Sequence, residues 1–413
     1  MKTILLTIGN EVLNGQVVDT NAAWLAQELL AEGLPVVEKW SVADEIPAIV
    51  EALGHCLDKG DLVITTGGLG PTQDDLTCEA LAVFLKVGRV FHAPTYEGIE
   101  QLFRKLGRLP SASHLDQARL PEGAGILTNP AGTAPGMHFV HMGKHIISMP
   151  GVPFEMKAIF NTQVRKLVQQ YKTGPKRFSH TFNTVGEGET LLEDLIHDIT
   201  AGAPSNIRFS FLPDLYRVRI RVDLDSENPE DHAAWLDIIQ QVRLKLHRYI
   251  AGENETTLEL AIGNILREKG WMMGTAESCT GGMIGHMITR NAGSSEYFKG
   301  GILAYSNELK SKFLEVDPLT LEKEGAVSEA TVRQMAAGAL DSLDVQVAVA
   351  VTGIAGPGGG SAEKPVGTVW IGVADIHGRI LSKKIQLRRD RLLNIQAAST
   401  MALILLHRFL LGE

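Results

Sequence analysis

Cysteine is scarce in this sequence. The three residues Cys56, Cys78 and Cys279 lie far apart and include no C-x-x-C pair. This spacing argues against a disulfide framework and against a cysteine-rich zinc site.

Positive charge is also in short supply. The chain has 39 Lys and Arg residues against 48 Asp and Glu residues, and its formal net charge is -9. A general nucleic-acid or membrane-surface binder carries a basic face, so we expect neither nucleic acid nor membrane as a partner. Small anionic ligands remain possible, because a local pocket can be positively charged even though the whole chain is negative.

Long apolar runs are missing as well. A membrane-spanning helix needs a run of roughly 18 or more apolar residues, and the sequence contains none. Gly9, Asn10 and Glu11 interrupt the first apolar stretch, which predicts a first strand in place of a signal peptide. The sequence therefore predicts a cytoplasmic protein.

The order of the patterns predicts three domains and an α/β fold class. Residues 1–172 alternate buried strands with helices, which predicts a mainly parallel sheet covered on both faces. Residues 173–252 contain period-2 strands and amphipathic helices, so they predict a small α+β unit. A linker is expected at about 251–257, and residues 256–413 form a second α/β domain.

The segment "TTGGLGPTQDDLT" (65–77) lies where a buried strand gives way to a helix. Its glycines Gly67, Gly68 and Gly70 allow backbone N–H groups to approach an anionic ligand closely. Asp74 and Asp75 would repel a bare diphosphate. A divalent cation such as Mg²⁺, bound between the carboxylates and the diphosphate, would remove this repulsion. Asp74 and Asp75, with Asp19, are therefore the candidate metal ligands.

The carboxyl edge of such a sheet is where ligands bind, and further polar residues are expected there. Glu11, Asp19 and Asn21 follow the first strand.

The segment "TAESCTGGMIGHMI" (275–288) has an apolar strand, a polar turn and a helix start. A serine cap with two glycines is the structural alternative to an active site. Three further segments favour an active site: "GGILAYSNELK" with Tyr305 and Lys310, the strand end at Thr352, and "RRDR" with Arg391, suited to phosphate.

"GNEVLNGQVVDTN", "TTGGLGPTQDDLT", "NPAGTAPG" and "MPGVPFE" resemble the molybdopterin-binding-type domain of the competence/damage-inducible protein A (CinA) family. The resemblance implies a metal-dependent hydrolysis of ADP-ribose to AMP and ribose 5-phosphate, with Mg²⁺, Mn²⁺ or Co²⁺. Asp75 and Thr77 match the Asp and Thr of the superfamily motif Asp-x-Thr. The substrate-binding residues implied here, beyond those already named, are Asn10, Asn129, Gly132, Thr133 and Glu155.

The carboxy-terminal segments resemble the CinA carboxy-terminal domain and the nicotinamide mononucleotide (NMN) deamidases, which release ammonia from NMN. The matched residues are Ser278, Thr280, Gly293, Tyr305, Lys310, Thr352 and Arg391, and Gly281 and Gly282 belong to the same turn. No cofactor is expected at this site. The middle unit resembles the KH-like insert of the family, and its "VGEGET" loop is acidic where RNA binding would require a basic one.

Amide hydrolysis needs a nucleophile, a proton shuttle and oxyanion donors. Ser278 is the predicted nucleophile, ahead of Cys279, whose side chain should point away. Lys310 would deprotonate Ser278 if burial depresses the pKa of Lys310. Deamidase relatives often carry a second Arg four residues after the first, and here that position is Ile395; Arg388 or Arg389 would then have to compensate.

The prediction is thus a bifunctional hydrolase of ADP-ribose and NMN. Two alternatives remain. The first is a molybdopterin-handling enzyme, which would use Asp75 but leave the carboxy-terminal half without a role. The second is a non-catalytic nucleotide-binding regulatory or competence protein.

A homodimer is expected, because the apolar face of the helix with Trp235, Leu236, Ile239 and Val242 requires a partner.

Overall fold

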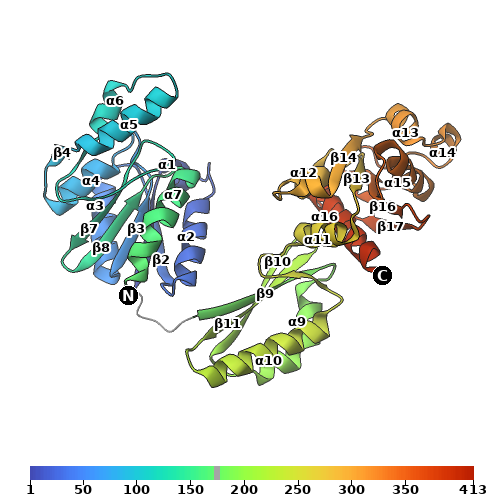
Figure 1. Cartoon of the computed structure of the whole chain (residues 1–413), viewed down its shortest axis with the longest axis horizontal. Helices are drawn as coiled ribbons and strands as arrows, with labels where there is room; N and C mark the ends of the chain where they lie inside the picture. The colour runs from blue at the N-terminus through green and yellow to red at the C-terminus, as the bar shows by residue number, and fades with distance from the viewer. Residues whose placement is uncertain (172–176) are drawn as a thin grey trace. The chain divides into compact units, whose positions relative to one another are not determined.

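The computed structural model describes residues 1–171 and 177–413, which form two compact units, Met1–Arg177 and Phe178–Glu413. Our predicted boundary at residues 172 and 173 lies outside the described residues. Three main sheets, one in the first unit and two in the second, confirm an α/β chain in which the sheet with the fewest strands comes second in chain order (Figure 1).

The first unit is built on a six-stranded sheet of order β2-β1-β3-β8-β7-β6. β1, β2, β3 and β8 run parallel, and β7 and β6 continue the sheet antiparallel. All residues of β1 and β3 are buried, as expected for strands covered on both faces. The strands are β1 (Thr3–Ile8), β2 (Val36–Val42), β3 (Leu62–Thr66), β6 (Gly125–Leu127), β7 (Gly136–His141) and β8 (Lys144–Met149), with β4 (Arg89–Phe91) and β5 (Arg119–Pro121) in a separate hairpin-like pair.

Helices cover both faces of this sheet. One apolar core joins it to α3 and α4, and a second joins it to α2, α7 and the helical turns after α7. Figure 1 shows α5 and α6 beyond the strand ends. The helices are α1 (Asn10–Leu13), α2 (Thr20–Ala31), α3 (Ile46–Lys59), α4 (Thr77–Leu85), α5 (Ala93–Lys105), α6 (Ala112–Gln117), α7 (Pro153–Ile159), the π-helical turn η1 (Phe160–Val164) and α8 (Arg165–Gln169).

The second unit begins with the small sheet, of order β10-β11-β9-β12. β12 pairs with β9, so residues 251–253 of the predicted linker belong to a strand; the backbone hydrogen bonds of that pair hold them in the sheet. The elements are β9 (Arg177–Val185), α9 (Glu189–Gly202), β10 (Ile207–Asp214), β11 (Arg217–Asp225), α10 (Pro229–Leu246) and β12 (Ile250–Glu253).

The apolar face of α10 packs inside this domain. Trp235, Ile239 and Val242 are buried against the sheet, and the Trp235 indole donates to the Val222 carbonyl at 3.1 Å. Only Leu236 of the predicted face is exposed. Our argument that this face requires a second subunit was therefore wrong, because the domain's own strands cover it.

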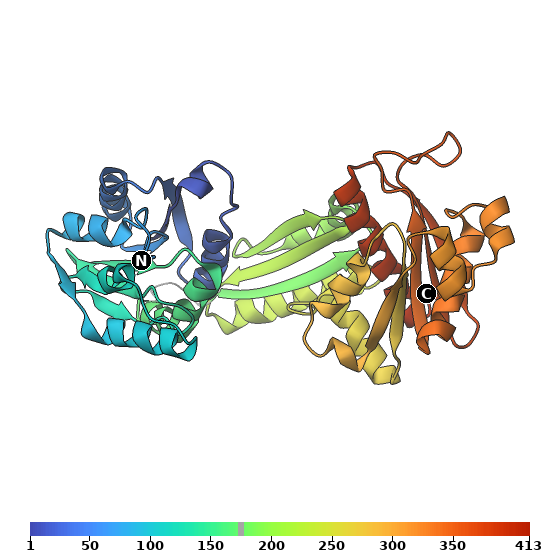
Figure 2. The ribbon, with the colours of Figure 1, turned by 90° about the horizontal axis from the view of Figure 1, so that it is seen from above.

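The remainder of the second unit is a five-stranded sheet of order β14-β13-β15-β16-β17, in which β14, β13 and β15 are parallel. α11, α12 and α16 pack on one face and α13 and α15 on the other (Figures 1 and 2). The strands are β13 (Met273–Glu277), β14 (Phe298–Leu303), β15 (Val347–Gly353), β16 (Thr368–Asp375) and β17 (Ile380–Gln386). The helices are α11 (Leu258–Lys269), α12 (Met283–Thr289), η2 (Ser294–Glu296), α13 (Asn307–Leu314), α14 (Pro318–Lys323), α15 (Glu329–Leu343) and α16 (Arg391–Leu411).

α16 is long and apolar enough to cross a membrane by length and composition alone. Of its most apolar window, 72% is buried inside the domain. Such burial is typical of a core helix, and Leu403, Leu406 and Phe409 pack in the core.

Two candidate active sites

The first site lies where the parallel strands of the amino-terminal sheet end. Thr7 on β1 is level with Thr66 on β3, which is level with Met149 on β8, so the three strands end together. The segments that follow them line a cavity of about 470 Å³. This is the edge at which the sequence predicted a ligand.

Two glycines shape the turn after β3. Gly67 has φ +111°, and a methyl group on it would lie 2.0 Å from the Ile8 carbonyl oxygen. Gly68 has φ +65°, and a methyl group there would lie 2.2 Å from Thr77 Oγ1. Thr77 itself is fully buried and donates from its hydroxyl to the Gly67 carbonyl at 2.8 Å. Thr77 therefore supports the turn from behind, which corrects our prediction that it binds substrate.

The turn presents free donors to the cavity. Within the described residues, the amides of Gly68, Leu69 and Gly70 donate to no other protein group, and all three residues line the cavity. Gly70 also leaves room for Asp75, since a methyl group there would lie 2.4 Å from Asp75 Oδ2. Such converging amides can hold a phosphate group.

Carboxylates dominate the rest of the lining. No Lys or Arg is among the described residues that line this acidic cavity. The acidic residues are Glu11, Asp44, Asp74, Asp75 and Glu155.

Asp44 was missed by the sequence analysis. It follows β2, the edge strand that runs parallel to β1, so its position just past a strand end was the available signal. Burial raises the pKa of Asp44, and the negative charges of Glu11, Asp74 and Asp75 raise it further. The hydrogen bond from the Asn10 backbone amide acts in the opposite direction. The crowding of like charges indicates a place for a cation.

The remaining acids differ in their surroundings. Burial raises the pKa of Glu155, although a hydrogen bond from Asn129 opposes the rise. A hydrogen bond from the Thr72 hydroxyl lowers the pKa of Asp74. The Thr72 amide donates to Asp75 Oδ2 at 2.9 Å, and the single Thr72 hydroxyl proton is shared between Asp74 and Asp75, whose Oδ2 lies 2.5 Å from the hydroxyl oxygen. Both Asp74 and Asp75 lie before α4, two to three residues ahead of its first residue.

A hard divalent cation fits this donor set. Mg²⁺ commonly keeps several waters and uses one or two carboxylates together with substrate phosphates. The described side chains contain no group of three or more His, Cys, Asp or Glu gathered closely enough to hold an ion alone. The arrangement therefore fits a cation that is shared with a phosphate ligand.

Asp19 leaves the predicted ligand set. Its carboxylate accepts from Thr7 Oγ1 at 2.7 Å and from the Ala22 amide at 2.9 Å, and it pairs with Lys39 at 3.2 Å. Burial opposes its ionisation, but these partners lower the pKa of Asp19 below its ordinary value. Asp19 is the N-cap of α2, and both of its oxygens have protein partners.

Asn10 and Asn21 hold neighbouring loops. The Asn10 backbone amide donates to Asp44. The Asn21 side-chain amide donates to the Gly151 carbonyl at 2.6 Å. Neither side chain lines the acidic cavity, whereas Gly151 does. Asn21 thus positions the segment after β8, a different role from the substrate contact that we predicted.

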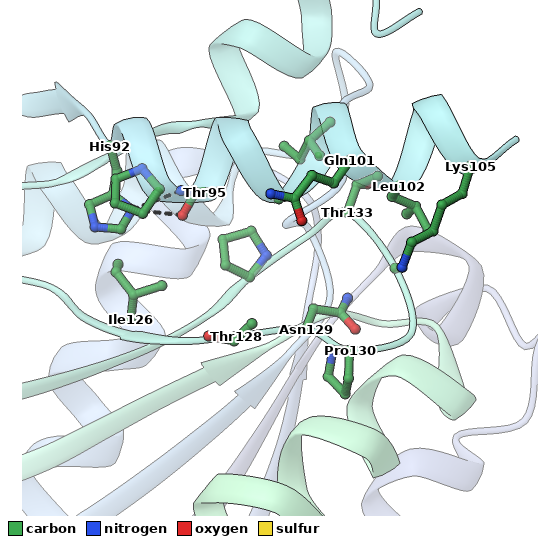
Figure 3. Close-up of a pocket in the computed structure, with 15 residues that line it drawn as sticks. His92, Thr95, Gln101, Leu102, Lys105, Ile126, Thr128, Asn129, Pro130 and Thr133 are labelled. Carbon is green, nitrogen blue, oxygen red and sulfur yellow. Dashed lines mark hydrogen bonds between the residues drawn. The ribbon is translucent and has the colours of Figure 1, made fainter. Parts of the chain in front are cut away.

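Asn129, Gly132 and Thr133 line a second cavity beside the first, under α5 (Figure 3). Asn129 Nδ2 donates to Glu155 Oε2 at 2.6 Å, and Thr133 lines both cavities. The predicted segment "NPAGTAPG" therefore forms the wall between them.

The second candidate site is at the carboxyl ends of β13, β14 and β15. Glu277 on β13 is level with Leu303 on β14 and Val351 on β15. The residues that follow bring together Ser278, Tyr305 and Thr352. Lys310 reaches the same place from α13.

Lys310 is in direct contact with Ser278. Its Nζ lies 3.0 Å from Ser278 Oγ, 2.7 Å from the Ala304 carbonyl oxygen and 3.4 Å from the Tyr305 carbonyl oxygen. Lys310 is 1% exposed and pairs with no carboxylate among the described residues. Burial lowers its pKa. A neutral amine can donate its two protons to the two carbonyls and accept the Ser278 proton with its lone pair.

Cys279 is in a poor state to act as a nucleophile. Burial raises the pKa of its thiol to about 12, although Lys310 opposes the rise. The nucleophilic form of cysteine is the thiolate, so at neutral pH this thiol is inactive. The contacts thus support Ser278 over Cys279.

Glu277 supports the turn that carries Ser278. It is 1% exposed, and its carboxylate accepts from the amides of Gly282, Ile284 and Gly285 at 3.0, 3.1 and 2.9 Å. The Gly282 amide is therefore not available to an oxyanion or phosphate.

Gly281 and Gly282 have φ +62° and +98° and form the bend between Ser278 and α12. The Thr280 hydroxyl is buried and finds no partner among the described residues, which fits a role toward substrate.

Tyr305 and Arg391 form the outer part of the site. Arg391 Nη2 donates to the Tyr305 hydroxyl at 3.3 Å, and Nη1 donates to the Gly356 carbonyl at 2.7 Å. Tyr305 is 64% exposed, so both groups are accessible to a ligand. The Thr352 hydroxyl instead donates to the Ala326 carbonyl at 2.8 Å and fastens that loop.

Comparisons with known proteins agree with this two-part arrangement. Residues 4–170 match the family described as probable molybdopterin binding domain, and residues 255–410 match the CinA C-terminal domain. A CinA-like protein of Cytophaga hutchinsonii is 40% identical over 98% of this chain and 97% of its own length. The chain belongs to the CinA family.

Two further similar proteins illustrate the range of the matches. A putative competence-damage inducible protein of Halothermothrix orenii is 39% identical over 98% of both chains. The crystal structure of competence/damage inducible protein CihA from Agrobacterium tumefaciens is 43% identical, covers 36% of this chain and 91% of that chain, and has a TM-score of 0.36.

Gly293, which was matched to the CinA deamidase pattern, lies outside the second site, and Ile395 is the position where the chain departs from that pattern. Gly293 has φ +79° and begins the turn at η2, where a methyl group would lie 3.3 Å from Arg267. Gly293 is in contact with Arg267 and not with Ser278 or Lys310, so we assign it a structural role in the turn. Ile395 packs against the domain core, one helical turn after Arg391, so this part of α16 carries no second guanidinium. Arg388 and Arg389 are exposed.

Proposed function

We propose that this CinA protein is a bifunctional hydrolase that acts on ADP-ribose in its amino-terminal domain and on NMN in its carboxy-terminal domain. The buried contact between Lys310 and Ser278, with no carboxylate paired to the lysine among the described residues, is the observation on which the second activity rests. The names of the relatives refer to competence and damage and specify no reaction.

In the carboxy-terminal site, neutral Lys310 takes the proton of the Ser278 hydroxyl while Oγ attacks the amide carbon of NMN. The protonated lysine then gives its proton to the leaving nitrogen, the C–N bond breaks, and ammonia departs. Water, deprotonated by the same lysine, hydrolyses the Ser278 ester and releases nicotinate mononucleotide. Arg391 and Tyr305 are the candidates for holding the phosphate of the substrate. No metal takes part in this scheme.

In the amino-terminal site, the amides of Gly68, Leu69 and Gly70 cradle the diphosphate of ADP-ribose. Carboxylates among Glu11, Asp44, Asp74 and Asp75 would hold a divalent cation jointly with the phosphates of the substrate. Such a cation would neutralise charge between the carboxylates and the phosphates and would activate water as a nucleophile. Glu155 and Asp44, whose pKa values are raised, are the candidates for moving a proton at the reacting oxygen atoms.

One experiment tests both activities. Purified protein is incubated with ADP-ribose and with NMN, with and without EDTA, and the products are separated. We expect AMP and ribose 5-phosphate only with the metal, and ammonia in both conditions. Loss of ammonia release in EDTA, with recovery on adding metal, would contradict our scheme for Lys310 and Ser278.

The same assay separates the alternatives. A molybdopterin-handling enzyme would leave ADP-ribose intact, and a regulatory scaffold would bind nucleotides without releasing any product. A homodimer and a cytoplasmic location remain part of the proposal, and light scattering that gives a 44.8 kDa particle at all concentrations would exclude the dimer.

A further inference from the structure

Asn394 is a buried polar side chain near the start of α16 that has no role in the scheme above. It is 1% exposed and lies one helical turn after Arg391. Asparagine is a weak helix former, because its side chain competes for the hydrogen bonds of the backbone. Its presence at a buried helical position is therefore explained by the contacts of its side chain and not by helix formation.

The Asn394 side chain makes three hydrogen bonds, all of them to backbone groups. Its Nδ2 donates to the Arg389 carbonyl at 2.8 Å and to the Ala355 carbonyl at 3.0 Å. Its Oδ1 accepts from the Arg389 amide at 3.1 Å. Both protons of the side-chain amide are thus used, and an ionised Asp of the same shape would offer neither of them.

These bonds join the start of α16 to the second candidate site. Arg389 precedes α16, and Ala355 belongs to the loop after β15. Four residues before Ala355, the Val351 carbonyl of β15 accepts from the Ser278 amide at 3.0 Å. The start of α16 is therefore fastened to the strand that also holds the turn of Ser278.

Arg391 uses the next carbonyl of the same loop. Its Nη1 donates to the Gly356 carbonyl at 2.7 Å, and its Nη2 donates to the Tyr305 hydroxyl at 3.3 Å. Arg391 is exposed, so the direction of this long side chain depends on where the loop and the helix start lie. Asn394 and Arg391 thus hold the consecutive carbonyls of Ala355 and Gly356 from one helix.

The direction of Arg391 matters because no second arginine follows it closely. Within the described residues 392–398 there is no Lys or Arg, and Ile395 packs against the core. A guanidinium binds a phosphate well only when its planar donors are correctly oriented.

We propose that Asn394 is a positioning residue, which holds the start of α16 against the loop after β15 so that the Arg391 guanidinium faces the phosphate of a bound mononucleotide. Asn394 acts through Arg391 and does not touch the ligand. The inference rests on the proposed function for the identity of the ligand, but its test measures binding and requires no turnover.

The test measures the affinity of the full-length protein by calorimetry for nicotinate mononucleotide, the proposed product, and for nicotinic acid riboside, the same molecule without its phosphate. Wild-type protein should bind the nucleotide at least about tenfold more tightly, because of the charge-assisted phosphate contact. Asn394→Asp and Asn394→Leu both remove the two donors. Each should weaken nucleotide binding about tenfold and leave riboside binding within about twofold, which also shows that the site is folded.

A double variant separates positioning from an independent effect. Arg391→Met should weaken nucleotide binding by a similar factor, and Asn394→Leu combined with Arg391→Met should bind no more weakly than Arg391→Met alone, because both changes remove one contact. Gln396→Leu is the matched control, since Gln396 is an exposed neighbour on α16 whose side chain bonds to no other described residue.

The inference is overturned if the wild type binds neither ligand or binds both equally, or if the Asn394 variants leave nucleotide binding unchanged. It is also overturned if they weaken both ligands equally, or if the effects of Asn394→Leu and Arg391→Met add. A failure of the proposed function gives a different result: NMN stays intact while nucleotide binding still depends on Asn394, which supports the inference and rejects the deamidation.

Discussion

The acidic cavity and the Ser278–Lys310 site both lie where parallel strands end, but their charges are arranged in opposite ways. The acidic cavity has five carboxylates and no Lys or Arg among its described lining residues. The second site has one buried lysine and no paired carboxylate among the described residues. Under the proposed function, the first arrangement would need an external cation to receive a phosphate, whereas the second already holds the proposed base, Lys310, against the proposed nucleophile, Ser278.

The difference indicates how each site is completed. In the first, the carboxylates are not gathered into a closed ligand set, so substrate and cation would complete it together. In the second, burial lowers the pKa of Lys310, and α13 places its Nζ 3.0 Å from Ser278 Oγ, so under the proposed function the protein alone supplies the acid–base chemistry. Variants in one site should therefore leave the other unaffected.

The largest effect is expected for Ser278→Ala. Loss of the nucleophile should reduce ammonia release from NMN by about a thousandfold or more, while ADP-ribose hydrolysis stays at the wild-type rate. Cys279→Ala is the matched control and should retain most of the deamidation, because the thiol stays protonated. An inactive Cys279→Ala protein beside an active Ser278→Ala protein would make the thiol the nucleophile.

Lys310→Met should be nearly as damaging to deamidation. In the wild type, activity should rise with pH through a pKa well below about 10.4, the ordinary value for lysine, since only the neutral amine can accept the Ser278 proton. A pH profile without such a rise would remove Lys310 as the base.

Lys310 should also affect stability. Because its folded-state pKa is lowered, the unfolded chain binds more protons between the folded and unfolded pKa values, so the contribution of Lys310 to stability increases as pH rises through that interval. Lys310→Met should remove this pH dependence, as measured by denaturant unfolding at several pH values.

Asp75→Asn should reduce ADP-ribose hydrolysis by about a hundredfold and leave ammonia release unchanged. The variant removes one negative charge from the acidic cavity and weakens the hydrogen bonds from Thr72. Asp44→Asn should act in the same direction, and the metal concentration at half-maximal rate should rise in both. Wild-type turnover in both variants would separate the acidic cavity from the reaction.

Glu277→Gln should have a moderate effect confined to deamidation. The amide replaces one carboxylate oxygen that accepts from the Gly282, Ile284 or Gly285 amide, so the turn of Ser278 is held less firmly. We expect kcat to decrease by about tenfold, with KM for NMN and the pH profile nearly unchanged. A shift of the pH profile would instead show that Glu277 acts on Lys310 through its charge.

The smallest effect is expected for Asp19→Ala, which tests our correction at the first site. Loss of this N-cap should lower the free energy of unfolding by about 1 kcal/mol, and the metal dependence of ADP-ribose hydrolysis should stay as in the wild type. An increased metal requirement would return Asp19 to the ligand set.

The sequence by itself determined the order of the elements and the local motifs. The buried strand runs, the glycines after β3 and the polar turn after β13 are short-range patterns, and a chain positions them within a few residues whatever surrounds them. For that reason the α/β class was predicted correctly, and the structure brings the predicted pair Ser278 and Lys310 into contact and places Asp75 in a cavity at the strand ends.

Only the tertiary structure decided which polar groups face a ligand and which serve the protein. Asp19, Asn21, Thr77 and Thr352 are in motifs that indicate binding, yet each has its side chain bonded to a neighbouring segment. Asp44 and Glu277 reach the sites because β2 lies beside β1 and because three amides of the α12 start converge on one carboxylate. Strand order and hydrogen-bond direction depend on contacts between residues far apart in the chain, so no local pattern could supply them.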